Sequence, residues 1–282
     1  MKKIFKNTLK KDGNSDKILE VSLVGASMPE VIGLIEKRLE SQQKTFIVTP
    51  NPEFLVFSQE NPWFKTILKQ ADLAIPDGVA LIWAREVIRG KNLPSRLFIG
   101  FKTGFQVIFQ GWGVKRVTGT DLTNKLCQLA ARKDNSVYFL GGKGQTATIA
   151  LKKLQIRYPN LKGWAETGPN LRLKDGNWIK NSQDIDKWVN EINQKQPDLL
   201  FVAFGMGKQE KFIYDNWSRL KVKLAIGVGG SFDYHSGQVG RAPNQIQKAG
   251  FEWLYRLVKE PWRFKRQLSL LKFVCLILIG RN

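Results

Sequence analysis

Histidine and cysteine are almost absent from this chain of 282 residues, which has one histidine, His235, and two cysteines, Cys127 and Cys275. Two cysteines cannot form a disulfide framework, so we expect free thiols in a reducing compartment. So few potential ligands also make a structural zinc site a poor explanation of the fold. Long apolar runs are missing too: the segment 273–279 (FVCLILI) is far shorter than the about 20 residues of a membrane span.

Acidic residues are scarce, with 24 Asp and Glu against 45 Lys and Arg, and the formal net charge is +21. Such an excess predicts attraction to polyanions, meaning nucleic acid, anionic lipid headgroups or phosphorylated substrates. Nucleic-acid binding is the weaker alternative, because no RRM, KH or helix-turn-helix pattern is present. An apolar content of 43% is normal for a folded globular protein.

Short apolar segments alternate with helical ones through most of the chain. This alternation predicts an α/β fold with a mainly parallel, Rossmann-like sheet and flanking helices. A helix should begin after Ser27, because Ser27 and Glu30 form a capping box. The expected strands cover 45–49, 72–75, 137–140, 199–204 and 224–228.

Three parts are expected along the chain. Residues 1–17 form a basic flexible arm without the apolar core of a signal peptide. Residues 18–245 form the α/β catalytic domain, and residues 246–282 form a helical, basic appendage that associates with a membrane. Within the domain, residues 91–115 are an insertion rich in phenylalanine and glycine with weak periodicity. We favour a hydrophobic flap or hairpin there, with buried core as the alternative.

Glycines follow several of the expected strands. Strands that end in glycine can present backbone N–H groups to a phosphate, which makes Gly142 and Gly229 candidate binding residues. The segment beginning at Gly142 also fits G-x-G-x-x-A, a dinucleotide pattern, but the acidic ribose ligand expected about 20 residues later is not evident. A tight strand-to-helix turn near a nucleotide is therefore favoured over a nicotinamide site.

Polar residues follow two other expected strands. Thr49 and Asn51 come after one of them, and Asp77 comes after the next, between Pro76 and Gly78. The carboxyl ends of parallel strands meet in the usual ligand crevice, so an aspartate held there can act as a general base. An Asx-turn, common for Asp-Gly, is the alternative explanation of Asp77.

Four cations recur near the end of the chain: Arg256, Lys259, Arg263 and Arg266. On one continuous helix they would form a stripe about 80° wide, which suits a diphosphate. That stripe requires the helix to continue through Pro261, which can instead start a second helix. A solvated surface stripe is the alternative, although the neighbouring aromatic residues are unusually apolar for one.

The pair Asp184 and Asp186 imitates the D-x-D sequence of metal-dependent glycosyltransferases. Both acids fall at the start of a polar helix, where carboxylates interact favourably with the helix dipole. We therefore interpret them as capping residues and expect no metal site.

Seven segments occur in the order TPNPEF, IPDG, RVTGTDL, YFLGG, FGMGKQEKFI, GVGGSFDYHSGQVGRAP and EWLYRL-x3-PWRFKR. Together they resemble the WecG/TagA/CpsF family of bacterial glycosyltransferases over about residues 20–268. The resemblance implies an inverting enzyme that needs no metal and no cofactor. It implies transfer of N-acetylmannosamine or a related hexose from a UDP-sugar donor to an undecaprenyl-diphosphate-linked sugar.

The resemblance also implies a place in the cell. Such an enzyme would be cytoplasmic and peripheral on the inner face of the bacterial plasma membrane, and would build cell-surface polysaccharide or teichoic acid. Its partners would be the donor, the polyprenyl-diphosphate-linked acceptor and an anionic membrane surface, with homo-oligomers possible and no nucleic acid. A catalytically inactive scaffold of the same fold is the alternative, against which the intact Thr49 and Asp77 argue.

By resemblance, Asp77 would be the catalytic base and Thr49 its neighbour at the acceptor pocket. Two departures affect this assignment: the insertion 91–115 is longer than usual, and Gly207 stands where the family often has proline. The residues expected to bind substrate are Asn51, Arg116, Gly142, Gln209, Gly229, Arg256, Arg263 and Arg266.

The end of the chain would also hold the enzyme at the membrane. Residues 251–282 contain seven Lys and Arg against two Glu, and basic residues near an anionic surface contribute about 1 kcal/mol each. The apolar side chains of Leu268, Leu271 and Cys275 would insert as in a monotopic helix.

Overall fold

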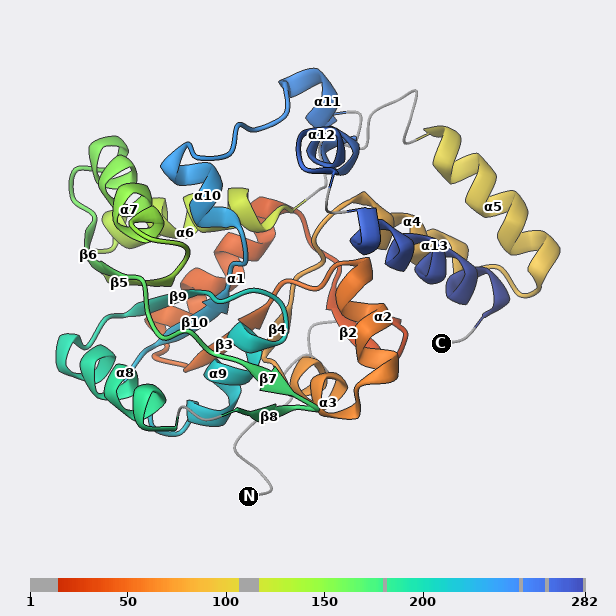
Figure 1. The fold of residues 1–282 in the computed structure, drawn as a ribbon. Coiled ribbons are helices and arrows are strands. Elements are labelled where there is room, and N and C mark those ends of the chain that lie inside the picture. The colour runs from red at the N-terminus through yellow and green to blue at the C-terminus, as the bar shows by residue number, and fades with distance from the viewer. Residues whose placement is uncertain (1–14, 107–116, 180–181, 249–250, 262–263, 281–282) are drawn as a thin grey trace.

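A six-stranded parallel sheet forms the centre of the computed structural model, which describes residues 15–106, 117–179, 182–248, 251–261 and 264–280 (Figure 1). The strand order is β4-β3-β10-β9-β5-β6, and every neighbouring pair is parallel. The expected α/β fold with a mainly parallel sheet is confirmed. The strands are β3 (Thr45–Val48), β4 (Leu73–Ala74), β5 (Ser136–Gly141), β6 (Lys162–Glu166), β9 (Leu199–Ala203) and β10 (Leu224–Gly227).

Helices cover both faces of the sheet, which is why its strands are apolar on both sides. One face packs against α2 (Pro52–Glu60), α3 (Pro62–Gln70), α8 (Ser182–Lys195) and α9 (Lys208–Asn216). The other face packs against α1 (Met28–Glu40), α6 (Gly119–Arg132), α7 (Thr146–Arg157) and α10 (Ser231–Ser236).

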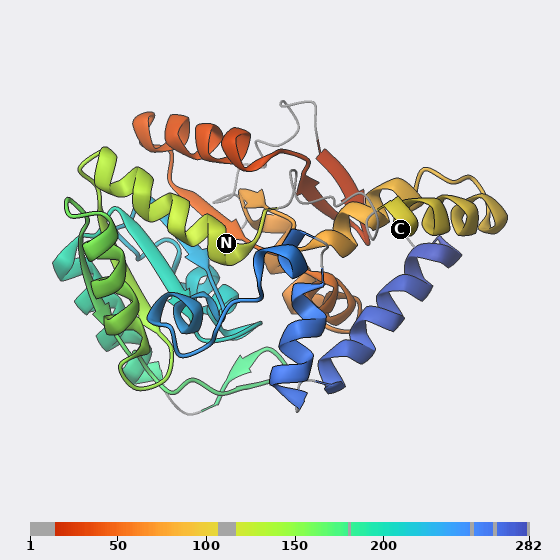
Figure 2. The same cartoon turned by 90° about the horizontal axis from the view of Figure 1, so that it is seen from above.

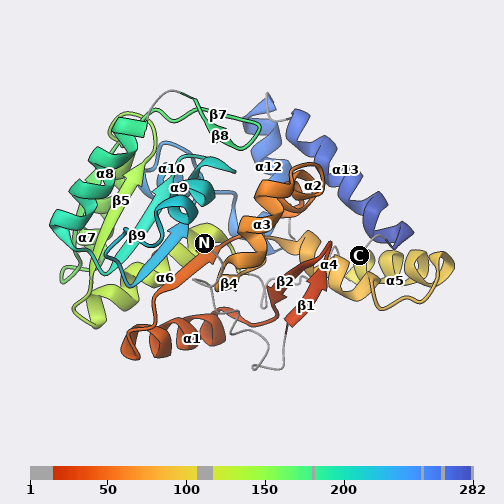
Figure 3. The same cartoon turned by 90° about the horizontal axis from the view of Figure 1, so that it is seen from below.

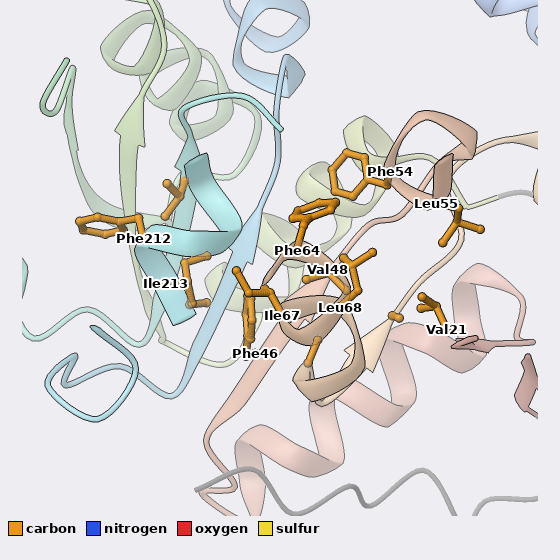
Figure 4. Packing of buried hydrophobic residues seen from close by; sticks show 14 of the residues in the cluster. Val21, Phe46, Val48, Phe54, Leu55, Phe64, Ile67, Leu68, Phe212 and Ile213 are labelled. Atoms are coloured by element: carbon orange, nitrogen blue, oxygen red, sulfur yellow. The ribbon is translucent and has the colours of Figure 1, made fainter. Parts of the chain in front are cut away.

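Strand β3 shows how one sequence serves both layers. Phe46 and Val48 belong to the first core cluster, and Ile47 between them belongs to the second. This is the two-residue alternation of a strand. In the first cluster, Phe46 and Val48 lie beside Phe64 and Ile67 of α3, and all four side chains are buried (Figure 4).

The boundary expected for the basic arm, after residue 17, lies too far along the chain. Residues 15–17 belong to β1 (Ser15–Ile18), which pairs antiparallel with β2 (Val21–Val24). Asp16 forms an ion pair with Arg85, so this strand is attached to the fold; the rest of the expected arm lies outside the described residues. The capping box of Ser27 and Glu30 is present, and α1 begins at Met28, directly after Ser27, as predicted.

The insertion 91–115 was expected to form a flap or hairpin, with buried core as the alternative. Over its first part both predictions are wrong. Helix α5 (Leu93–Gln106) follows α4 (Val79–Val87), and the remainder of the insertion lies outside the described residues. The indole Nε1 of Trp83 donates a hydrogen bond to the carbonyl oxygen of Gly100 at 3.0 Å, which fixes α5 on α4. Buried core is excluded because α5 exposes most of its large apolar side chains.

The chain ends in α11 (Asn244–Lys248), α12 (Glu252–Lys259) and α13 (Phe264–Ile279). Helix α12 ends before Pro261, so the interpretation as one continuous helix is wrong. The alternative, a second helix after α12, agrees with the structure. Helix α13 packs against α2, α4 and α5, with Phe273 and Ile277 buried in the first core cluster. The domain division at residue 246 stays a prediction. No helix among the described residues is long and apolar enough to cross a membrane.

Candidate active site

A cleft of about 1140 Å³ opens at the carboxyl ends of the parallel strands. Each of the six strands contributes to it a residue that follows its last position, as expected for ligand crevices of parallel sheets. We call these residues the rim: Thr49, Asp77, Gly142, Thr167, Gly205 and Gly229. The opposite side, which we call the helical wall, consists of the cleft-lining residues of α12 and of the first turns of α13: Glu252, Arg256, Ser269 and Leu270. Seen from above, these two blue helices lie together, away from the green helix α7 (Figure 2).

Asp77 is held in the rim by its backbone and by a neighbouring helix. Its N–H donates to the carbonyl oxygen of Pro50 at 2.8 Å, and its Oδ1 accepts from the N–H of Gly119 at 3.3 Å. Gly119 is the first residue of α6, where the helix dipole favours a negative charge. The next residue, Gly78, has φ of +94° and is the N-cap of α4, a conformation that glycine adopts without strain. The carboxylate is therefore fixed in the rim of the cleft.

Thr49 and Asn51 both line the cleft, and both also have structural contacts. The hydroxyl of Thr49 donates to the carbonyl oxygen of Gly227 at 3.2 Å, which links β3 to its neighbour β10. The side-chain oxygen of Asn51 accepts from the N–H of Phe54 at 3.0 Å and caps α2. Their positions are compatible with substrate contact, and their hydrogen bonds also hold the rim together.

Gln209 is only 2% exposed, yet it touches the cleft and organises two glycine loops. Its Oε1 accepts from the N–H of Gly229 at 3.0 Å, and its Nε2 donates to Oε1 of Glu210 at 2.7 Å. The other carboxyl oxygen of Glu210 accepts from the N–H of Gly207 at 2.8 Å. Burial raises the pKa of Glu210 to about 7. This pair thus connects the loop after β9 with the loop after β10.

Gly142 lies in a tight turn after β5. Its φ is +84°, and its N–H donates to the carbonyl oxygen of Ala203 at 3.0 Å. A Cβ on the preceding residue, Gly141, would lie 2.6 Å from that same oxygen. Only glycines allow the strands β5 and β9 to approach so closely at the floor of the cleft.

Arg256 reaches from the helical wall to the loop that follows β10. Its Nε donates to Oε2 of Glu260 at 2.9 Å, and its guanidinium lies 5.0 Å from the ring centroid of Tyr234. Its Nη2 is buried and has no hydrogen-bond partner among the residues that the structure describes, and a Cβ built on Gly230 would lie 3.2 Å from it. A buried guanidinium nitrogen in this state is suited to an anionic ligand.

The profile of the Glycosyl transferase WecG/TagA/CpsF family matches residues 17–101 and 105–282 of the chain. The chain belongs to this family. It is a glycosyltransferase, and the expected resemblance is confirmed. The break in the match falls within α5.

Two curated relatives carry the name N-acetylglucosaminyldiphosphoundecaprenol N-acetyl-beta-D-mannosaminyltransferase. The relative from Bacillus spizizenii is 29% identical over 262 residues, which cover 93% of this chain and 90% of the relative. The relative from Bacillus subtilis is 27% identical over 265 residues, covering 94% and 91%. The similarity therefore extends over nearly the whole length of each protein.

Seven of the ten predicted site residues of the glycosyltransferase line the one cleft: Thr49, Asn51, Asp77, Gly142, Gln209, Gly229 and Arg256. Arg116 and Arg263 lie outside the described residues, and of Arg266 the structure describes only its place in α13. Their roles stay predictions.

Sequence reasoning missed Arg241, which connects the rim side of the glycosyltransferase to α12. Its guanidinium forms two hydrogen bonds to the carboxylate of Asp121, at 2.6 and 2.8 Å, and a longer contact of 3.4 Å to Glu252. The bonds to Asp121 and the nearby charge of Glu252 raise the pKa of Arg241. Its place in the segment GRAP, two residues before Pro243, was the available indication that its backbone is restricted.

Of the two residues of the D-x-D sequence, Asp186 does not line the cleft of the glycosyltransferase, and for Asp184 the structure describes only its place in α8 (Ser182–Lys195). Asp186 pairs with Arg219 at 2.7 Å on the surface of α8. Within the parts of the chain that the structure describes, no three His, Cys, Asp or Glu side chains gather as a metal site would require. Metal independence stays a prediction.

Proposed function

We propose that this glycosyltransferase moves N-acetylmannosamine, or a related hexose, from a UDP-sugar to an undecaprenyl-diphosphate-linked N-acetylglucosamine. The proposal rests on one observation: the carboxylate of Asp77 and the guanidinium of Arg256, from opposite ends of the chain, line the same cleft. The printed names of the two relatives support the sugar and the acceptor. The product would enter cell-surface polysaccharide or teichoic acid synthesis.

The reaction would be a direct displacement. Asp77 takes the proton of the acceptor hydroxyl as that oxygen attacks the anomeric carbon, and the bond from this carbon to UDP breaks. Attack from the face opposite the leaving group inverts the anomeric centre. A positioned general base contributes about 10²–10⁴ in rate, and the two backbone contacts of Asp77 hold it in one orientation.

The departing diphosphate needs positive groups around it. Arg256 supplies one, and the loop residue Gly230 supplies a backbone N–H beside it. The N–H of Gly229 already donates to Gln209, so Gln209 is a positioning residue that fixes the loop under the diphosphate. We assign Arg116, Arg263 and Arg266 to the same anionic region, and we propose that no metal takes part.

The acceptor would reach the cleft from a bilayer. We place the enzyme on the cytoplasmic face of the plasma membrane, held there by the cations and apolar residues of α13. The location fits the cleft, because Ser269 and Leu270 of α13 line it and connect the membrane-facing end to the site.

The test is release of UDP by the purified full chain, measured with a series of UDP-sugars and a short-chain polyprenyl-diphosphate N-acetylglucosamine. We expect release with UDP-N-acetylmannosamine, dependence on the acceptor, and no effect of EDTA. Release that does not require the acceptor, or no release with any donor, would refute the proposal. A gel shift with RNA and DNA tests the nucleic-acid alternative, for which we expect no specific complex.

A further inference from the structure

Helix α5 carries an exposed apolar surface that the proposed reaction does not use. Phe101 is 78% exposed and Phe98 is 69% exposed, and three further large apolar side chains on the helix are about half exposed. None of these residues lines the cleft. The five residues, which we call the α5 face, are Leu93, Leu97, Phe98, Phe101 and Phe105.

The α5 face is continuous. On a helix that advances about 100° per residue, its five members fall within an arc of about 140° that contains no charged residue. Lys102 lies at one margin of this arc and Arg96 lies beyond the other. The opposite side of the helix packs on the protein, where Gly100 and Thr103 are buried. An apolar arc bordered by cations is typical of helices that lie in the interface of a membrane.

The sequence segment that contains α5 carries charge of one sign. From residue 87 to residue 120 it contains six Lys and Arg and no Asp or Glu, and residues 261–282, which contain α13, also have no acid. In a chain with 24 acidic residues, two such segments are complementary in charge to anionic lipid headgroups.

Helices α5 and α13 lie next to each other at one end of the molecule (Figures 1 and 3). Arg96 joins them, since its Nε donates to the carbonyl oxygen of Gly90 at 2.9 Å and its Nη1 donates to that of Leu278 at 3.5 Å. Helix α13 has its own exposed apolar stripe, which consists of Phe264, Leu268, Leu271, Cys275 and Ile279. The α5 face and the stripe of α13 thus lie on two neighbouring helices that are in contact.

We propose that α5 is a membrane-inserting helix, and that its apolar face enters the acyl region of an anionic bilayer while Lys91 and Lys102 contact the headgroups. A second copy of the chain fits this face less well, because two copies would bring their acid-free, cationic borders together. The inference takes from the proposed function only that the acceptor is embedded in a bilayer.

The test is flotation of the full chain with vesicles of equal parts phosphatidylglycerol and phosphatidylcholine, without donor or acceptor. The variant Phe98→Ser/Phe101→Ser removes apolar area without changing the charge. We expect its partition coefficient to fall about tenfold for each phenylalanine. The matched control is Ile156→Ser on α7, since Ile156 is 81% exposed and lies away from α5. That control should float like the wild type. Thermal melting and turnover of the short-chain acceptor should match the wild type in both variants.

Unchanged flotation of the double variant, or an equal loss in the Ile156→Ser control, would overturn the inference. A sedimentation experiment that shows a wild-type dimer and a monomeric double variant would also overturn it, because a second copy would then cover the α5 face. Flotation is measured without sugar transfer. Binding of α5 to vesicles can therefore be observed even if the proposed reaction is not, and the reaction can be observed even if α5 does not bind.

Discussion

The two sides of the cleft are built in different ways. On the rim, Gln209 is 2% exposed and Thr49 is buried, and side-chain hydrogen bonds connect the loops that follow neighbouring strands. On the helical wall, Val258 of α12 is 73% exposed, and Arg256 is held by Glu260, the residue that follows its helix, and by the ring of Tyr234. From this difference we infer that the sheet fixes geometry before a ligand arrives, and we propose that the helices contribute charge that completes the site.

If this comparison is correct, substitution of Asp77, the aspartate of the rim, has the largest effect on catalysis. Asp77→Asn should lower kcat by about 10²–10⁴ because it removes the general base. Binding of the UDP-sugar, measured by calorimetry, should be retained because the amide keeps the shape of the side chain. Asp233→Asn, which changes another cleft-lining aspartate, is the control. Activity of Asp77→Asn within twofold of the wild type, or a larger loss in the control, would remove Asp77 from this role.

The rim should also respond to pH through Glu210. Because burial raises its pKa from 4.5 to about 7 in the folded state, the folded state retains a proton that the unfolded state loses. The contribution of the protonated Glu210 to stability is fully present below pH 4.5 and is lost as the pH rises to about 7. Relative to that of the wild type, the free energy of unfolding of Glu210→Gln should therefore rise by about 3 kcal/mol between these pH values.

Urea unfolding of both proteins at pH 5 and pH 8 measures this change in relative stability. Glu40→Gln, at an exposed carboxyl on α1, is the matched control and should follow the wild type. A difference between Glu210→Gln and the wild type that does not depend on pH would show that the rim is not held by a protonated Glu210.

The helical wall should show a smaller effect that depends on shape. Arg256→Lys keeps the charge but loses the planar fork of the guanidinium, so we expect kcat/KM to fall about tenfold, the cost of about one charge-assisted hydrogen bond. Lys259→Ala on the same helix is the control, because Lys259 is exposed and does not line the cleft. Equal losses in both variants would indicate a general charge effect instead of a defined contact.

Much of the rim could be predicted from the sequence, because its chemistry is local. Short apolar runs that end in Thr49, Gly142 or Gly229 predict strands, and parallel strands bring their carboxyl ends together. Asp77 is held by backbone contacts that the Pro-Asp-Gly turn already suggests. The start of α1 follows from its capping box in the same way.

The helical wall could not be predicted to the same extent, because its position depends on contacts between distant segments. The sequence left open whether the four cations lie on one helix or on two, whereas in the structure α12 ends at Lys259 and α13 packs against α2. Arg241 was missed because its carboxylate partner, Asp121, lies 120 residues away. Helix α5 was mistaken for a flap because its glycines are poor helix formers and because its apolar residues face outward instead of toward a core.

A crystal structure of the full chain with UDP and an acceptor analogue tests the central claim most directly. We predict that the diphosphate lies within hydrogen-bond distance of Arg256 Nη2 and of the backbone N–H groups at Gly230, with the acceptor hydroxyl next to the carboxylate of Asp77. A diphosphate bound away from Arg256, or an acceptor hydroxyl out of reach of Asp77, would contradict the account.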